Sequence, residues 1–169
     1  MPKTAKELPE MRRLLFCLLT LGLPVQAQPA FVSRQAWGSR PQPIPASMEH
    51  RPDRVVLHHA GVLWKHGDRS RSKIRALQSW GQREKGWPDL PYHFLLDPEG
   101  TIYEGREMRF RPESNTQYDL TGAINVHLWG DFDQQRVSLP QLRSTVELLA
   151  WLADQWQLQK VTTHCQEAP

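Results

Sequence analysis

The sequence has 169 residues, of which 39% are hydrophobic, and this is enough for one domain that buries a real core. The formal net charge of +3 falls to +1 when residues 1–27 are removed, because these carry four basic and two acidic residues. That balance excludes a nucleic-acid-binding surface, and the seven Trp residues are a high count for a side chain that often lines grooves.

The segment MRRLLFCLLTLGLPVQAQ has the three parts of a secretory signal peptide. Arg12 and Arg13 form its positive region, Leu14–Leu23 its apolar stretch, and Val25–Ala27 a small-residue cleavage site. The apolar stretch is shorter than the about 20 residues that a membrane-spanning helix needs. We therefore predict a signal peptide over residues 1–27 and a secreted or periplasmic bacterial protein; the alternative is an uncleaved N-terminal anchor.

Cleavage at this site would leave a mature chain over residues 28–169 with a single thiol. Cys17 leaves with the signal peptide, so Cys165 remains and no internal disulfide can form. Export without disulfides is ordinary for a bacterial periplasmic enzyme. We expect a monomer with no stable membrane span after cleavage.

Strand and helix patterns alternate after the signal peptide. Residues 29–53 are proline-rich and aperiodic, which predicts an irregular arm. The β-branched run RVVLHH, residues 54–59, predicts a buried strand. Residues 70–86 carry apolar side chains at helical spacing and end at Gly86, a common helix stop.

The second half of the chain predicts a hairpin, a strand, a helix and a last strand. Residues 92–105 form the hairpin around an Asp-Pro-Glu-Gly turn, residues 122–132 a buried strand, and residues 160–164 the last strand. The helix spans residues 138–157, begins with a capping box, and has one apolar stripe expected to face the core: Leu142, Val146, Leu149, Leu152 and Trp156. This order predicts a single α/β domain with a mixed central sheet flanked by helices.

Two of the seven histidines end β-branched runs, namely His58 and His164. Strand ends at the rim of a sheet are where mixed α/β domains place their sites. A catalytic zinc needs about three protein ligands and one open position for water. The spacing of the two histidines contains no local metal motif, so a structural, hydrogen-bonded role is the alternative for each.

Four segments, SRQAWGSRP, VVLHHAG, GWPDLPYHFLLDPEGTIYEGR and VTTHCQEAP, occur in an order that resembles a known family. They are similar to the zinc-dependent N-acetylmuramoyl-L-alanine amidases of the second amidase family, which includes peptidoglycan recognition proteins and phage lysozyme-type amidases. The resemblance runs from about Ser33 to the end of the chain. It implies a mixed sheet flanked by helices, with zinc in a groove at one face.

The resemblance also implies roles for single residues. It makes His58 and His164 zinc ligands, and Tyr92 the tyrosine that helps the zinc-bound water to attack. Because neighbouring strand residues face opposite ways, His59 and His93 are expected not to be ligands.

His127 departs from the family pattern, since one branch carries a catalytic glutamate at the matching position. It is a candidate for a catalytic base, a substrate contact or a filler of the groove wall. Candidates for lining a glycan-peptide groove are Trp64, His66, Trp87 and Arg106. Alternatively, the tryptophans belong to the core and Arg106 pairs with Glu104 in a turn.

In the family, a third zinc ligand, Cys or Asp, lies about eight residues past the second histidine. The sequence stops before that position, so we expect this to be a C-terminally truncated form that binds zinc poorly and shows little amidase activity. Cys165 is expected on the same strand as His164 but facing elsewhere, so it is not expected to substitute.

The implied reaction is hydrolysis of the amide between N-acetylmuramic acid and L-alanine in peptidoglycan or muropeptides. The alternative is a peptidoglycan-binding protein of the same fold without catalysis. An unrelated secreted adaptor with structural zinc would need a closed site of four ligands, for which the cysteines are too few.

Overall fold

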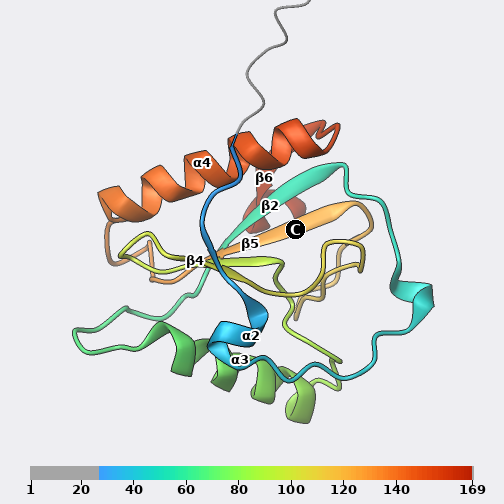
Figure 1. Cartoon of the computed structure of the whole chain (residues 1–169), viewed down its shortest axis with the longest axis horizontal. Coiled ribbons are helices and arrows are strands. Elements are labelled where there is room, and N and C mark those ends of the chain that lie inside the picture. The colour runs from blue at the N-terminus through green and yellow to red at the C-terminus, as the bar shows by residue number, and fades with distance from the viewer. Residues whose placement is uncertain (1–26, 169) are drawn as a thin grey trace, which may run out of the picture.

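The computed structural model describes residues 27–168 (Figure 1), so the predicted signal peptide lies outside the described residues except for Ala27. In chain order the elements are β1 (Phe31–Val32), α2 (Arg34–Trp37), η2 (Ala46–Met48), β2 (Arg54–His59), α3 (Ser70–Glu84), β3 (Phe94–Leu96), β4 (Ile102–Glu104), β5 (Ala123–Leu128), α4 (Leu139–Gln155), β6 (Lys160–Thr163) and α5 (His164–Glu167). None of the helices in residues 27–168 is long and apolar enough to cross a membrane.

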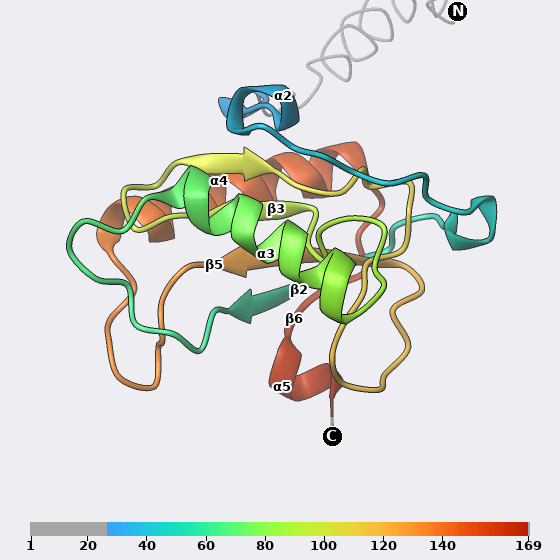
Figure 2. The ribbon, with the colours of Figure 1, turned by 90° about the horizontal axis from the view of Figure 1, so that it is seen from below.

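The six strands form one mixed sheet in the order β1-β4-β3-β5-β2-β6. Strands β3, β5, β2 and β6 are parallel to one another, whereas β4 pairs antiparallel with β3 through the predicted hairpin. Helix α4 covers one face of the sheet, and α2 and α3 cover the other (Figure 1; Figure 2). The predicted α/β fold, with a mixed sheet flanked by helices, is confirmed.

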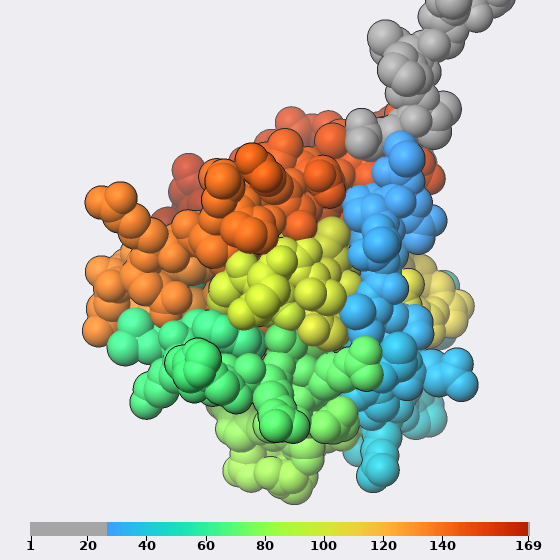
Figure 3. All heavy atoms as spheres, turned by 60° about the vertical axis from the view of Figure 1, so that its left-hand side comes forward, coloured from blue at the N-terminus to red at the C-terminus, as the bar shows by residue number. Residues whose placement is uncertain are grey.

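The arm predicted as irregular contains three short elements that attach it to the sheet. Strand β1 pairs in parallel with β4, and the space-filling view shows this part of the arm lying along the hairpin (Figure 3). The indole of Trp37 is fully buried and its Nε1 donates to the Glu104 carbonyl at 2.7 Å. The arm therefore closes one edge of the sheet.

The buried face of α4 is rotated about the helix axis relative to the apolar stripe predicted from the sequence. Leu142 and Val146 are 51% and 58% exposed, while Gln141 and Thr145 are buried. These two polar side chains tolerate burial because both are hydrogen-bonded. Gln141 Nε2 donates to carbonyls of β3 and the segment after β5, and Thr145 Oγ1 donates to the Gln141 carbonyl. Leu152 is buried as expected.

The last strand is one residue shorter than expected, and His164 is the first residue of α5. Thr163 and Gln166 form a capping box, in which the Thr163 backbone N–H donates to Gln166 Oε1 at 2.9 Å. Cys165 consequently lies on α5 rather than on a strand with His164. Its thiol is exposed and lies 3.1 Å from Thr163 Oγ1.

Candidate functional site

Three histidines lie side by side at the carboxyl ends of neighbouring parallel strands. The register pairs His58 of β2 with His127 of β5, and Leu57 of β2 with Thr163 of β6. His164 therefore follows at the level of His58. Since side chains alternate along a strand, the imidazoles of His58 and His127 are on the face opposite to Val55, which packs in the α4 core. The His164 imidazole lies beside that of His58 on the same face.

These histidines line a pocket of about 400 Å³ on the α3 side of the sheet. Its wall is strongly aromatic, which is the composition typical of ligand pockets with a few polar groups at fixed positions. Besides the three histidines, its lining includes Trp80, Trp87, Tyr92, Glu113, Thr116 and Trp129.

His58 and His164 form the polar centre of the pocket, with ring centroids 4.9 Å apart. His58 Nε2 and His164 Nδ1 are buried and have no hydrogen-bond partner among the described residues. Burial, together with the nearby His164, lowers the pKa of His58 to about 4. Neutral imidazole nitrogens without partners are the donor set that a zinc ion takes, so these two residues fit a metal.

Tyr92 lies over both His58 and His127. Its ring centroid is 5.3 Å from that of His58 and 4.4 Å from that of His127, with which it stacks at 26°. Burial raises the pKa of Tyr92 to about 12. The hydroxyl therefore stays protonated at neutral pH and can donate a hydrogen bond to an oxygen that becomes negative.

His127 is almost fully buried between Tyr92 and Trp129, whose ring meets it edge-on at 4.7 Å. Neither of its ring nitrogens has a partner among the described residues. Burial lowers the pKa of His127 to about 3, so the imidazole is neutral and can both donate and accept. Trp129 was missed by the sequence analysis, although its place two residues after His127 puts it on the same strand face.

The four predicted groove residues differ in their positions. Trp87 lines the pocket and packs edge-on against Trp80, with ring centroids 5.8 Å apart. Trp64 is not part of the pocket lining but packs against Trp129, with ring centroids 6.1 Å apart. His66 is in an exposed turn and is also not part of the lining. The structure thus brings only Trp87 to the pocket directly.

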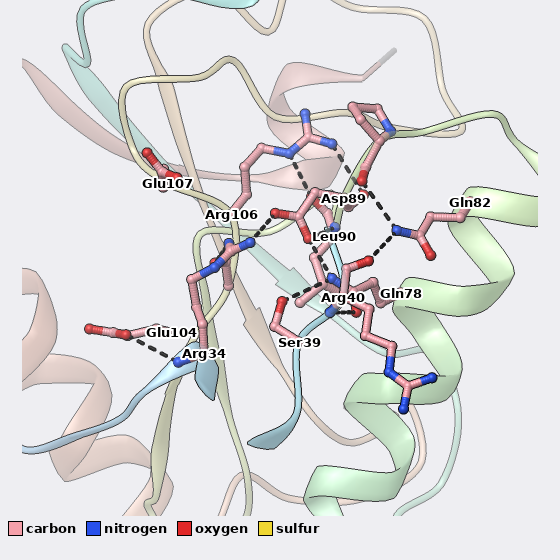
Figure 4. A network of polar contacts seen from close by, with 12 residues as sticks. Arg34, Ser39, Arg40, Gln78, Gln82, Asp89, Leu90, Glu104, Arg106 and Glu107 are labelled. Carbon is pink, nitrogen blue, oxygen red and sulfur yellow. Dashed lines mark hydrogen bonds and ion pairs between the residues drawn. The ribbon is translucent and has the colours of Figure 1, made fainter. Parts of the chain in front are cut away.

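Arg106 is not a groove residue, because its side chain is fully buried and has no surface to offer a substrate. Its guanidinium donates to the carbonyls of Asp89 and Leu90 (Figure 4). It also donates to the Arg111 carbonyl and the Glu113 carboxylate. The alternative pairing with Glu104 is also wrong, since that carboxylate accepts from the Arg34 backbone N–H. Arg106 holds together the loops that frame the pocket.

His59 forms, with Asp131 and Asp133, a group of residues that could hold a cation. Their ligand atoms lie within 4.8 Å of one another, and this is the group of three metal-ligating side chains found within residues 27–168. However, His59 Nδ1 accepts from the Phe132 backbone N–H, and Asp131 accepts from the Asp133 N–H and Gln134 Nε2. Because these atoms already accept hydrogen bonds from the loop that follows β5, we interpret the group as the cap of a turn.

His93 is fully buried and both of its ring nitrogens have partners. Nε2 lies 3.0 Å from the Phe110 carbonyl, and Nδ1 accepts from the Asn125 backbone N–H at 2.9 Å. These contacts make it a structural histidine with no nitrogen free for a metal.

Comparison with known proteins gives matches over most of the chain. The family model described as N-acetylmuramoyl-L-alanine amidase matches residues 48–168. Peptidoglycan recognition protein 1 of Mus musculus is 27% identical over 119 residues, which are 70% of this chain and 65% of that protein. The chain thus spans about two thirds of the length of this relative.

Solved structures share the fold at lower sequence identity. Drosophila peptidoglycan recognition protein SD superposes with a TM-score of 0.74 at 23% identity, over 83% of this chain and 86% of that one. The N-acetylmuramoyl-L-alanine amidase LysC of Clostridium intestinale gives a TM-score of 0.68 at 21% identity, over 83% and 85%. The ectodomain complex of peptidoglycan recognition proteins LCa and LCx bound to tracheal cytotoxin gives a TM-score of 0.71 at 24% identity, over 83% of this chain and 87% of that one.

Proposed function

The chain belongs to the N-acetylmuramoyl-L-alanine amidase family, and on that premise we propose that it is a zinc-dependent amidase of peptidoglycan or muropeptides. The bond hydrolysed is the amide between N-acetylmuramic acid and L-alanine. The observation that carries the proposal is the pair of unpartnered nitrogens, His58 Nε2 and His164 Nδ1, beside Tyr92 in one pocket. The predicted signal peptide supports a secreted or periplasmic location, and we propose a monomer.

His58 and His164 would hold the zinc ion. When bound, zinc supplies an activated water at neutral pH and polarises the amide carbonyl. Hydrolysis breaks the C–N bond, adds the hydroxyl of water to the carbonyl carbon, and leaves a proton on the L-alanine amine.

The residues around the histidines bind and orient the substrate. The Tyr92 hydroxyl donates a hydrogen bond to the carbonyl oxygen as that oxygen gains negative charge. His127 is too weak a base to accept a proton efficiently at neutral pH, so we assign it a hydrogen bond to the substrate. The tryptophan wall, with Trp87 in front and Trp64 supporting Trp129, packs against the substrate and excludes water.

Binding of peptidoglycan fragments without catalysis is the second candidate function. It is favoured by the similarity to a mouse recognition protein and to the recognition proteins LCa and LCx, which were solved with tracheal cytotoxin. Both functions use the same aromatic pocket, and they differ in whether the two histidines hold a metal.

The decisive experiment compares wild type with His58→Ala, using His66→Ala as a matched control outside the pocket. For wild type and the control we expect equal zinc contents by elemental analysis and equal release of stem peptide from muropeptides. His58→Ala should lose both and remain folded. Wild-type protein that binds muropeptide but neither holds zinc nor releases peptide would instead establish the binding function.

A further inference from the structure

Helix α5 carries His164 at its first position and has only four residues. A helix this short is not stable by itself in water, so its position depends on contacts with the rest of the protein. It packs against β2 and β6, and it begins with the capping box of Thr163 and Gln166 (Figure 2). The capping box joins residues 163 and 166 alone, so it does not attach the far end of the helix to the sheet.

Glu167, the last residue of α5, makes that attachment. Its Oε1 accepts from Lys160 Nζ and from Thr162 Oγ1, each at 2.9 Å, and both partners lie on β6. Its Oε2 lies 3.5 Å from Nε of Arg54, the first residue of β2. The Glu167 side chain is only 13% exposed, so these three contacts are largely shielded from water.

The three partners of the carboxylate lie on the face of the sheet that carries the histidines. Since side chains alternate along a strand, Arg54 and His58 are on the same face of β2. The parallel register places Lys160 opposite Arg54, and Thr162 opposite the residue midway between Arg54 and His58. Helix α5 thus lies over this face, with its first residue next to His58 and the carboxylate of its last residue next to Arg54.

Arg54 is a well-fixed partner, because the rest of its guanidinium is already bound. Nη1 donates to the Thr121 carbonyl and lies 3.3 Å from Asp53 Oδ1, and Nη2 donates to the Asp119 carbonyl at 2.6 Å. Its side chain is 10% exposed, and Nε has no hydrogen-bond partner among the described residues. Glu167 therefore supplies the negative charge on the Nε side of a buried cation, which is the kind of charge that needs a partner.

We propose that Glu167 is a positioning residue that fixes the place of His164 relative to His58. Arg54 is four residues before His58 on β2, and Glu167 is three residues after His164 on α5, so their ion pair connects the two segments that carry the histidines. The bonds to Lys160 and Thr162 connect the same carboxylate to the strand that leads into α5. Without the carboxylate, the helix keeps its capping box but loses its side-chain attachment to β2.

This inference rests on the proposed function, in which His58 and His164 hold zinc. Groups that orient metal-ligating histidines change metal affinity although they do not touch the metal. The inference also makes a statement about the metal-free protein, in which the same contacts keep the two imidazole rings side by side with centroids 4.9 Å apart.

The first test is the nuclear Overhauser contact between the ring protons of His58 and His164 in the metal-free protein. We expect this contact in wild type, because the rings are close. Glu167→Ala should weaken or remove it, whereas Glu167→Gln, which keeps an oxygen that can accept from Thr162, should lose less of it. Glu147→Ala, at an exposed position of α4, is the matched control and should leave the contact unchanged.

The second test is zinc affinity, measured by competition with a chelator. Glu167→Ala should bind zinc about 10–100-fold more weakly than wild type, and Glu167→Gln should lose less affinity than Glu167→Ala. Thr162→Val keeps the β-branched shape but removes the hydroxyl that donates to Glu167, so it should weaken zinc binding too. In the Glu167→Ala background it should have little further effect, because both changes remove the same contact.

Two results would overturn the inference. One is a wild-type protein without the contact between the two rings, and the other is ring contact and zinc affinity unchanged in both Glu167→Ala and Thr162→Val. If Glu167→Ala fails to fold, Thr162→Val decides, because its side chain is partly exposed and its shape is conserved. A ring contact that depends on Glu167 in a wild-type protein that binds no zinc would overturn the proposed function and leave the positioning role standing.

Discussion

Replacing Asp89 by alanine should destabilise the protein more than any exposed substitution of the same kind. The Asp89 carboxylate is fully buried and accepts from Arg34 Nη2 and Gln78 Nε2, each at 2.7 Å, and from the Leu90 backbone N–H at 2.8 Å (Figure 4). These bonds join α2, α3 and the segment that leads to Tyr92. Loss of the carboxylate affects all three at once.

The expected loss of unfolding free energy depends on the contacts that Arg34 and Gln78 retain after the substitution. Removing one member of a buried ion pair costs about 3–5 kcal/mol, because the other charge stays buried without compensation. The Arg34 side chain is 22% exposed and keeps its bond to the Gly105 carbonyl, and Gln78 keeps Ser39 Oγ at 3.0 Å. We therefore expect the lower end of this range, about 3 kcal/mol, in the free energy of unfolding.

Urea denaturation followed by tryptophan fluorescence measures this difference directly. Asp154→Ala, on the exposed side of α4, is the control and should change the free energy of unfolding by about 0.5 kcal/mol or less. Asp89→Asn keeps the volume and part of the hydrogen bonding, so it should fall between the two. An Asp89→Ala protein within about 1 kcal/mol of wild type would refute the reasoning, because the network would then contribute no more than a surface pair does.

Three further predictions concern the site and its supports. Tyr92→Phe should keep its zinc, measured by elemental analysis, but release stem peptide about 100-fold more slowly; an unchanged rate would remove the hydroxyl from the mechanism. Burial lowers the pKa of His93 to about 3, so the unfolded chain binds a proton first and stability is lost as the pH falls from about 6.5. His93→Gln should therefore reduce the slope of unfolding free energy against pH by about 1.4 kcal/mol per unit between pH 4 and 6, whereas an unchanged slope contradicts the burial argument. Gln141→Leu should cost about 1–3 kcal/mol in urea unfolding, because it leaves the Trp129 carbonyl unpaired, and a neutral result would mean that water replaces the amide.

Alternation along strands explains why much of the site could be predicted from the sequence. The β-branched run before His58 defines a buried strand, and its period of two fixes which of the two adjacent histidines shares a face with His127. The capping box that turns His164 into the start of α5 was also visible, as Thr163 followed three residues later by Gln166. It was missed because the β-branched residues before it favour a strand.

The remaining errors arose where tertiary contacts override local pattern. Gln141 is a polar residue on the buried side of α4, and only the carbonyls of Leu96 and Trp129 explain its place there. Arg106 likewise has partners between 5 and 17 residues away in aperiodic loops, where no spacing rule applies. A charged or amide side chain in the interior therefore has to be located from its partners, which sequence periodicity does not reveal.

The unpaired nitrogens also bear on the choice between the two functions. A buried polar group without a partner costs about 1–3 kcal/mol, and a domain has only about 5–15 kcal/mol of net stability. His58 Nε2 and His164 Nδ1 together thus represent a substantial loss in the free chain. A pocket that only bound a glycan or peptide would be more stable with apolar side chains at these positions. Histidines that held a cation would offset the same loss through the bonds they form with it, and this favours the proposed metal binding over substrate binding alone.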